Sequence, residues 1–195
     1  LFGYKQSGGA GSLGYEMYTK MIQRSLHESG KLDVDFKLLP EDVFINIYSG
    51  GLIPEKYISI ESIRLSVYKS ISIASRESEL DNLVFNLEDR FGPLPQEVIK
   101  LIRGQKLRLA ASRVGVNSIT RGSCGIIFSM SDLDSGEYVK SFIDYVFLFF
   151  NKNKYKHHIL PAKGLVFSVC IHLDKGEDIY TFFLRFLGKF ARVNQ

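Results

Sequence analysis

Residues 78–95 read SELDNLVFNLEDRFGPLP and contain the clearest boundary between two elements in this chain. The stretch predicts a helix that begins at Ser78, with Asp81 three residues later as the acid of a capping box. The helix should end at Phe91, because glycine suits the position after a helix and the proline that follows cannot continue one. Pro95 then opens the next helix, since proline is favoured in a first helical turn. We therefore expect a rigid corner between two helices.

Further elements are predicted on both sides of this corner. Apolar residues at helical spacing indicate a helix over 60–74, with Ser59 as its N-cap. The helix that follows the corner should extend over 95–115. Ahead of the first helix, the sequence predicts strands at 33–39 and 43–48.

The second half of the chain has a different pattern of predicted elements, in which strands and helices alternate. Residues 126–130 are strand-like, and residues 136–151 are helical and rich in aromatic side chains. A hairpin of 155–160 with 165–173 and a closing helix over 176–192 complete the pattern. The predicted fold class is α+β, with a helical first half packed with a small, mostly antiparallel sheet flanked by helices.

Composition limits the class of protein. The chain has 195 residues and a net charge of +4, and its longest strongly apolar run, 145–150, is far too short to span a bilayer. Its opening has no basic segment leading into an apolar one, so no secretory signal is predicted. Two cysteines are too few for a disulfide framework, which favours reduced thiols and a cytoplasmic location. The first residue is Leu1, which suggests a fragment of a longer chain.

A G-x-G-x-x-G pattern at Gly9, Gly11 and Gly14 raises the alternative of a nucleotide-binding enzyme. That mechanism needs a buried strand directly before the loop, so that backbone N–H groups point at the phosphates. The preceding YKQSG is polar and turn-like, and no Gly-Lys-Ser/Thr follows. Cofactor binding at 9–14 is therefore the least favoured alternative.

Histidine and cysteine residues in the hairpin raise the question of a metal site. His157 and His158 are adjacent, so on a strand they point to opposite faces. One of them with His172 and Cys170 makes only a partial ligand set, and half-buried strand histidines are the favoured interpretation. Cys124 lies in a turn that enters a strand and is predicted to be a small core residue. No catalytic, cofactor-binding or metal-ligating residues are predicted.

The helix over 95–115 is basic and offers a second function. It carries five basic residues against one acid, and a basic helix can contact nucleic-acid phosphates. These residues are spread around the helix instead of forming one stripe, which also suits a solvated face. The candidate nucleic-acid contacts are Lys100, Arg103, Lys106 and Arg113.

Two segments resemble one family, the bacterial transcription-repair coupling factors, which are superfamily 2 DNA translocases. The first is LFGYKQSGGAGSLGYEMY at the start of the chain, similar to the family's segment after its second motor lobe. The second comprises LIPEKYISIESIRLSVYKSI and LDNLVFNLEDRFGPLP, which resemble the start of the family's C-terminal domain. The translocation-segment residues by this resemblance are Gln6, Ser7, Gly8, Gly14 and Tyr18.

The resemblance implies a domain plan and a function. Residues 1–32 would be the tail of the translocation segment, and 33–195 the C-terminal regulatory domain, with strands and three helices over 33–115 and a small α/β part over 116–195. The whole protein would hydrolyse ATP with Mg²⁺ in an upstream helicase-like motor to translocate on duplex DNA, remove stalled RNA polymerase and recruit UvrA. The fragment itself would hold no cofactor and no active site.

The same resemblance implies an autoinhibitory contact within the full-length chain. The C-terminal domain would pack on the N-terminal UvrA-binding module and mask it, beside the upstream motor lobes. The candidate interface comprises Asn86, Glu88, Asp89, Arg90 and Phe91. The family usually has an acid where Asn86 stands, so a latch to arginines of the partner module would keep at best neutral hydrogen bonds there.

Overall fold

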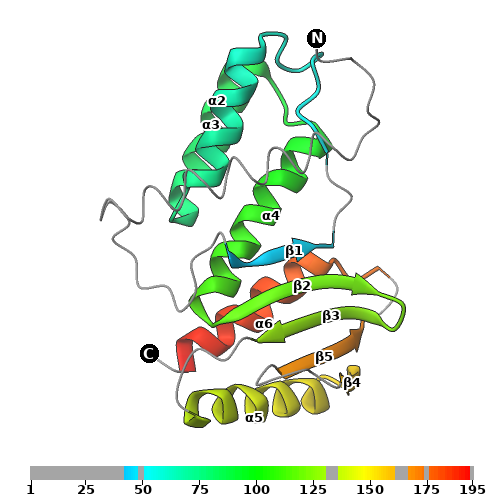
Figure 1. Cartoon of the computed structure of the whole chain (residues 1–195). Helices are drawn as coiled ribbons and strands as arrows, with labels where there is room; N and C mark the ends of the chain where they lie inside the picture. The colour runs from blue at the N-terminus through cyan, green and yellow to red at the C-terminus, as the bar shows by residue number, and fades with distance from the viewer. Residues whose placement is uncertain (1–41, 48–50, 131–135, 161–166, 174–175, 194–195) are drawn as a thin grey trace, which may run out of the picture. The chain divides into compact units, whose positions relative to one another are not determined.

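The computed structural model describes residues 42–47, 51–130, 136–160, 167–173 and 176–193 (Figure 1). They form two compact units, and we call them the helical unit, 51–102, and the sheet unit, 42–47 with 103–193. The strand predicted at 33–39 and the glycine-rich lead-in lie outside the described residues.

The helical unit is built on α2 (Glu61–Ile73), α3 (Glu77–Phe91) and the first part of α4 (Gln96–Arg113). Helices α2 and α3 pack side by side (Figure 1). The buried side chains of α2 include Val67 and Ile71, and those of α3 include Leu80 and Leu87. All three helices of the predicted corner region are therefore confirmed.

The starts of α2 and α3 differ from the predictions. The N-cap of α2 is Ile60, with no side-chain cap, so Ser59 does not fill that role. The carboxylate of Glu79 accepts the backbone N–H groups of Ser75 (2.8 Å) and Arg76 (3.4 Å), and α3 starts at Glu77. The predicted box of Ser78 with Asp81 was wrong by two residues, because the longer glutamate side chain reaches back over the first turn.

The sheet unit contains a five-stranded sheet in the order β1-β2-β3-β5-β4. Its strands are β1 (Phe44–Asn46), β2 (Val116–Gly122), β3 (Gly125–Met130), β4 (Lys156–Leu160) and β5 (Phe167–His172). Strand β1 pairs parallel with β2, and the other three pairings are antiparallel. The α+β class, the mostly antiparallel sheet and the β4–β5 hairpin are confirmed.

Strand β2 is the element that the sequence did not predict. It reads VNSITRG, in which the alternation of apolar and polar residues is broken. The structure shows the reason, because the register with β3 shifts between Val116 and Ser118. A bulge of this kind changes the face to which later side chains point.

Helices α5 (Gly136–Lys152) and α6 (Ile179–Val193) bury an aromatic core against one face of the sheet (Figure 1). At its centre, the ring of Phe128 makes edge contacts with rings of both helices, and their centroids lie 5.5–6.4 Å away: Phe142, Phe150, Phe183 and Phe186. Helix α6 was predicted from residue 176 but begins at Ile179, because the Asp178 carboxylate accepts the backbone N–H of Thr181 at 3.0 Å and caps it.

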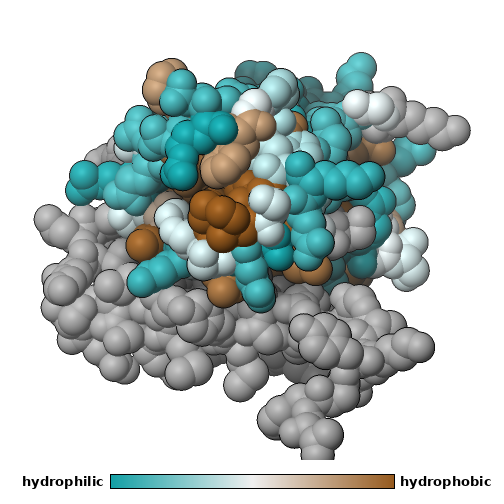
Figure 2. Space-filling model, turned by 90° about the horizontal axis from the view of Figure 1, so that it is seen from above, coloured by the Kyte–Doolittle hydropathy of each residue, from teal (hydrophilic) through white to brown (hydrophobic). Residues whose placement is uncertain are grey.

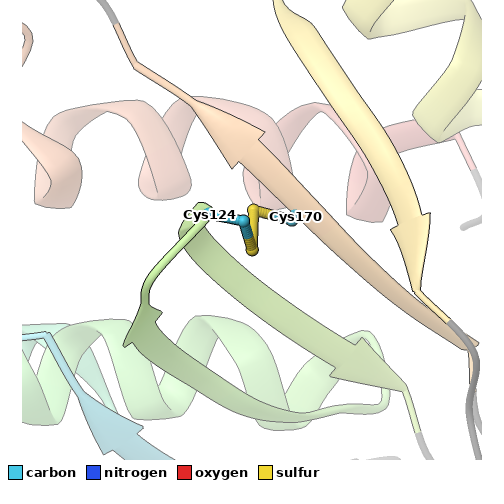
Figure 3. The surroundings of a disulfide bond; sticks show 2 residues. All are labelled: Cys124 and Cys170. Carbon is cyan, nitrogen blue, oxygen red and sulfur yellow. A yellow bond between two sulfur atoms is a disulfide. The ribbon is translucent and has the colours of Figure 1, made fainter.

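The opposite face of the sheet carries a disulfide between Cys124 and Cys170 (Figure 3). Cys170 belongs to β5, and Cys124 lies in the turn between β2 and β3. Strand β3 pairs with β5 with Ile127 opposite Cys170, which brings the turn over β5. The prediction of two reduced cysteines was therefore wrong, because a contact over 46 residues is set by sheet order and not by local sequence.

No helix formed by the described residues is long and apolar enough to cross a membrane.

Candidate partner-binding corner at the end of α3

The corner after α3 is held by Tyr57, which the sequence analysis did not single out. Its hydroxyl donates to the backbone carbonyls of Leu87 (3.2 Å) and Gly92 (3.1 Å), which lie on the last turn of α3 and just beyond it. Its ring meets Phe91 edge-on, with centroids 5.9 Å apart. The Tyr57 hydroxyl therefore links its own loop to the end of α3 and to the residue that follows it.

Arg64 and Tyr68, two residues of the segment LIPEKYISIESIRLSVYKSI, fix the loop that carries Tyr57. The guanidinium of Arg64 donates to the carbonyls of Ile58 (2.8 Å) and Ser59 (2.9 Å). The hydroxyl of Tyr68 accepts the backbone N–H of Ile53 at 2.6 Å. Arg64 and Tyr68 therefore have a structural role, since they tie the loop over 53–59 to α2.

Gly92 ends α3 with a backbone conformation that other residues rarely adopt. Its φ is 81°, and its N–H donates to the carbonyl of Glu88 at 3.0 Å. A side chain here would be strained because a positive φ brings Cβ close to the backbone. The sequence prediction of a helix end at Phe91 with Gly92 after it is confirmed.

The candidate interface residues lie at this fixed helix end. Asn86, Glu88, Asp89 and Arg90 are exposed, and Phe91 is half-buried. The guanidinium of Arg90 lies over the ring of Phe91, 5.1 Å from its centroid. Among the described residues, the side chains of Asn86 and Asp89 have no hydrogen-bond or ion-pair partner. The corner thus presents a carboxylate and an amide whose hydrogen-bonding capacity is unused.

Two acidic side chains, those of Glu88 and Asp89, lie at the end of α3. Burial raises the pKa of the Tyr57 hydroxyl, and the nearby charge of Glu88 raises it further. Glu88 and Asp89 are consecutive residues of the helix, so their side chains point in different directions. Together they cover a broader surface than one carboxylate would. Such a surface suits a partner that carries arginine or lysine side chains.

Phe85 adds an apolar group that the sequence analysis missed. It lies one helical turn before Asp89, and 72% of it is exposed. An apolar residue out of phase with the buried stripe of α3 is the signal that would have found it. The view from above shows a small hydrophobic group on the surface that is surrounded by hydrophilic residues (Figure 2).

The four candidate nucleic-acid contacts lie on α4, and at least three of them already interact with other residues of the protein. Arg103 makes an ion pair with Asp178 (3.5 Å) and lies over the ring of Tyr180, 5.1 Å from its centroid. Lys106 and Arg113 are half-buried and have partners of their own. Lys100 belongs to the helical unit, whereas the other three belong to the sheet unit. Of the four, Arg103 thus has its charge paired within the sheet unit.

The translocation-segment residues Gln6, Ser7, Gly8, Gly14 and Tyr18 lie outside the described residues, as does the Gly9–Gly14 pattern. Their roles stay predictions.

The sequence is similar to one family of proteins. The family model described as the TRCF domain matches residues 49–140. Transcription-repair-coupling factors of Buchnera aphidicola, Haemophilus influenzae and Escherichia coli are 29%, 32% and 26% identical to this chain over 130, 128 and 134 residues. Those alignments cover 65%, 64% and 68% of the chain but only 16%, 11% and 12% of the relatives.

A crystal structure of the C-terminal domain of a transcription-repair coupling factor has the same fold. Its TM-score is 0.61 at 19% identity, and the match covers 78% of this chain and 96% of that one. The family match includes α2, α3 and the corner, whose quoted elements carry the resemblance. Residues 49–140 thus match the TRCF domain, and the chain is similar in sequence to transcription-repair coupling factors and in fold to the C-terminal domain of one of them.

Proposed function

We propose that this chain is the C-terminal regulatory part of an ATP-dependent DNA translocase that removes stalled RNA polymerase and recruits nucleotide-excision repair. In this proposal, the end of α3 binds the N-terminal UvrA-binding module of the same full-length protein and masks it while the motor is idle. The observation that carries the proposal is an exposed Asp89 without a partner among the described residues, on a helix end that Tyr57 holds in place.

Two physical properties support a regulatory contact at this corner. A helix end that is already ordered loses little conformational entropy when a partner binds, which favours specific binding. The exposed groups are charged or polar, and a contact of this kind can form and break without exposing a large apolar surface. Both properties suit an interface that must open when the motor engages DNA.

The experiment is a binding measurement between this chain and the isolated UvrA-binding module by isothermal titration calorimetry. We expect binding that Asp89→Ala and Arg90→Ala each weaken about 10-fold or more, because each substitution leaves a charged partner group without its mate. Asp144→Ala is the matched control, since Asp144 is an exposed acid on α5 in the sheet unit. Equal affinities for all three variants and the wild type would remove the proposed interface.

A second variant tests the departure from the family pattern at Asn86. We expect Asn86→Asp to tighten binding to the same module about 3- to 10-fold, because it restores a carboxylate opposite basic groups. The gain should shrink as salt is added, since exposed charges are screened. Tighter binding that does not depend on salt would argue against a basic partner surface.

A further inference from the structure

A separate feature of the sheet unit brings four metal-ligating side chains together on the face opposite the aromatic core. Cys170 of β5 pairs across the strands with His158 of β4, so both side chains project from the same face. His172 lies two residues after Cys170 and therefore shares that face. The Cys124 sulfur reaches the same place, because it is bonded to Cys170 (Figure 3).

The two histidine rings already have a suitable spacing. The centroids of His158 and His172 lie 5.6 Å apart, with their planes at 89°. Two imidazoles on one tetrahedral zinc ion, with Zn–N bonds of about 2.0–2.1 Å, place their ring centroids roughly 5 Å apart. A small rotation of either exposed ring is enough to close the difference.

The disulfide is what keeps the ligand set incomplete. In the oxidised structure, no three His, Cys, Asp or Glu side chains of the described residues are placed to hold a metal ion. A sulfur in a disulfide is not a thiolate, and the thiolate is the form that ligates a metal. Reduction of the disulfide therefore supplies two thiolate ligands at once, beside the imidazoles of His158 and His172.

We propose that the reduced protein binds one zinc ion through Cys124, Cys170, His158 and His172, and that disulfide formation releases it. Two thiolates and two imidazoles in a tetrahedron are a ligand set of structural zinc sites. Cys170 is fully buried, which closes one side of the site, whereas both histidines are exposed and leave a path for the ion. Lys156 stands opposite His172 but is exposed, so its ammonium group can extend into water.

The chemistry balances with a cellular dithiol as the reductant. The dithiol gives two electrons and two protons to the Cys124–Cys170 bond and becomes a disulfide itself, leaving two thiols on the protein. Zinc binding then displaces the two thiol protons into solution. In the reverse direction, the disulfide form of that dithiol takes two electrons from the two zinc-bound thiolates and two protons from solvent and becomes a dithiol again. The Cys124–Cys170 bond forms and the zinc ion is set free.

The test uses the full chain, reduced with a phosphine, freed of metal with a chelator and then titrated with Zn²⁺ or Co²⁺. We expect one ion per reduced chain, with the thiolate-to-cobalt charge-transfer band and the ligand-field bands of a tetrahedral cobalt site. The disulfide form should take up none. A redox cycle should therefore release and rebind the ion stoichiometrically.

Variants of the ligands separate this site from adventitious binding. Cys170→Ser, His158→Ala and His172→Ala should each weaken zinc binding by more than the roughly 10- to 100-fold that loss of an outer-shell partner causes. His157→Gln is the matched control, because His157 neighbours His158 but packs against the rings of Phe147 and Phe150 on the other face. His27→Ala controls for the remaining histidine of the sequence.

Both exposed histidine variants should stay folded, so a loss of binding in them is informative even if Cys170→Ser unfolds. Circular dichroism of each reduced variant checks this. Absence of micromolar or tighter binding by the reduced wild type would overturn the proposal. Binding that survives His158→Ala and His172→Ala, or that the His27 and His157 variants weaken equally, would overturn it as well.

Discussion

Tyr57 shows how a residue outside the candidate interface can hold the end of α3 in place. Asp89, Arg90 and Phe91 could be named from the sequence because they form a compact element that resembles a family pattern. Tyr57 could not, since its hydroxyl meets carbonyls 30 and 35 residues away and nothing in its neighbours indicates that contact. Long-range hydrogen bonds of this kind need the fold before they can be assigned.

We expect Tyr57→Phe to lower the free energy of unfolding by about 0.5–1.5 kcal/mol, because the phenyl ring keeps the edge contact with Phe91 but loses both hydrogen bonds. Urea unfolding followed by circular dichroism measures the change. Phe85→Ala serves as a control that should change stability little, since that side chain is mostly exposed. An effect of Tyr57→Phe no larger than that of Phe85→Ala would contradict the assigned role.

We expect Tyr145 to make the stability of the protein depend on pH. Burial raises the pKa of its hydroxyl to about 12, and the nearby charge of Arg185 opposes the rise only in part. The hydroxyl donates to the carbonyl of Phe186 at 2.8 Å, and a tyrosinate cannot donate. A raised folded-state pKa means that this stabilisation is complete below the unfolded value of 10 and is lost as the pH rises through about 12.

Thermal unfolding at a series of pH values tests whether stability is lost, as expected, when the pH rises. The wild type should lose stability between about pH 10 and pH 12, and Tyr145→Phe should lose less over the same window because it has no hydroxyl to ionise. Parallel curves for the two proteins would show that Tyr145 does not contribute.

Helix α3 illustrates what local patterns determine and where they fail. Its end was predicted correctly, because glycine followed by proline leaves few alternatives. Its start was misplaced, since three acids and two serines compete over residues 75–81 and only the fold shows that Glu79 reaches back to Ser75. Strand β2 was missed for a related reason, as its bulge hides the alternation on which sequence reasoning depends.

We expect Glu79→Ala to destabilise the protein by about 0.5–2 kcal/mol, because two backbone N–H groups before α3 lose their acceptor. Ser78→Ala is the matched control and should be almost neutral, since Ser78 lies inside the helix and is exposed. The denaturant midpoints of the two variants decide whether Glu79 or Ser78 caps the start of α3. A larger cost for Ser78→Ala would restore the box predicted from the sequence.

The chain as a whole combines features that sequence reasoning predicted with features that depend on the complete fold. The α+β class was predictable because helical and strand periodicities are separated along the chain. The strand order and the Cys124–Cys170 bond were not, since both follow from pairings between distant segments. The basic helix α4 was predicted by composition, but composition did not show that Arg103 pairs with Asp178.

Binding to duplex DNA tests the alternative function that the basic residues of α4 raise. We expect the chain to bind DNA no more tightly than roughly 10⁻⁴ M at physiological salt, the weak end of non-specific affinities, because Arg103 already pairs within the sheet unit. Fluorescence anisotropy over a salt series measures this. Tighter binding that Lys100→Ala and Lys106→Ala both weaken would instead support a nucleic-acid interface on α4.

The parallel pairing of β1 with β2 has a consequence for how the protein is made. About 70 residues, including α2, α3 and α4, separate Asn46 from Val116. A ribosome that adds roughly 5–20 residues per second releases β1 several seconds before its partner strand exists. The helical unit can therefore form first, and the nascent β1 must remain without its neighbour until β2 has been made and pairs with it at the edge of the sheet.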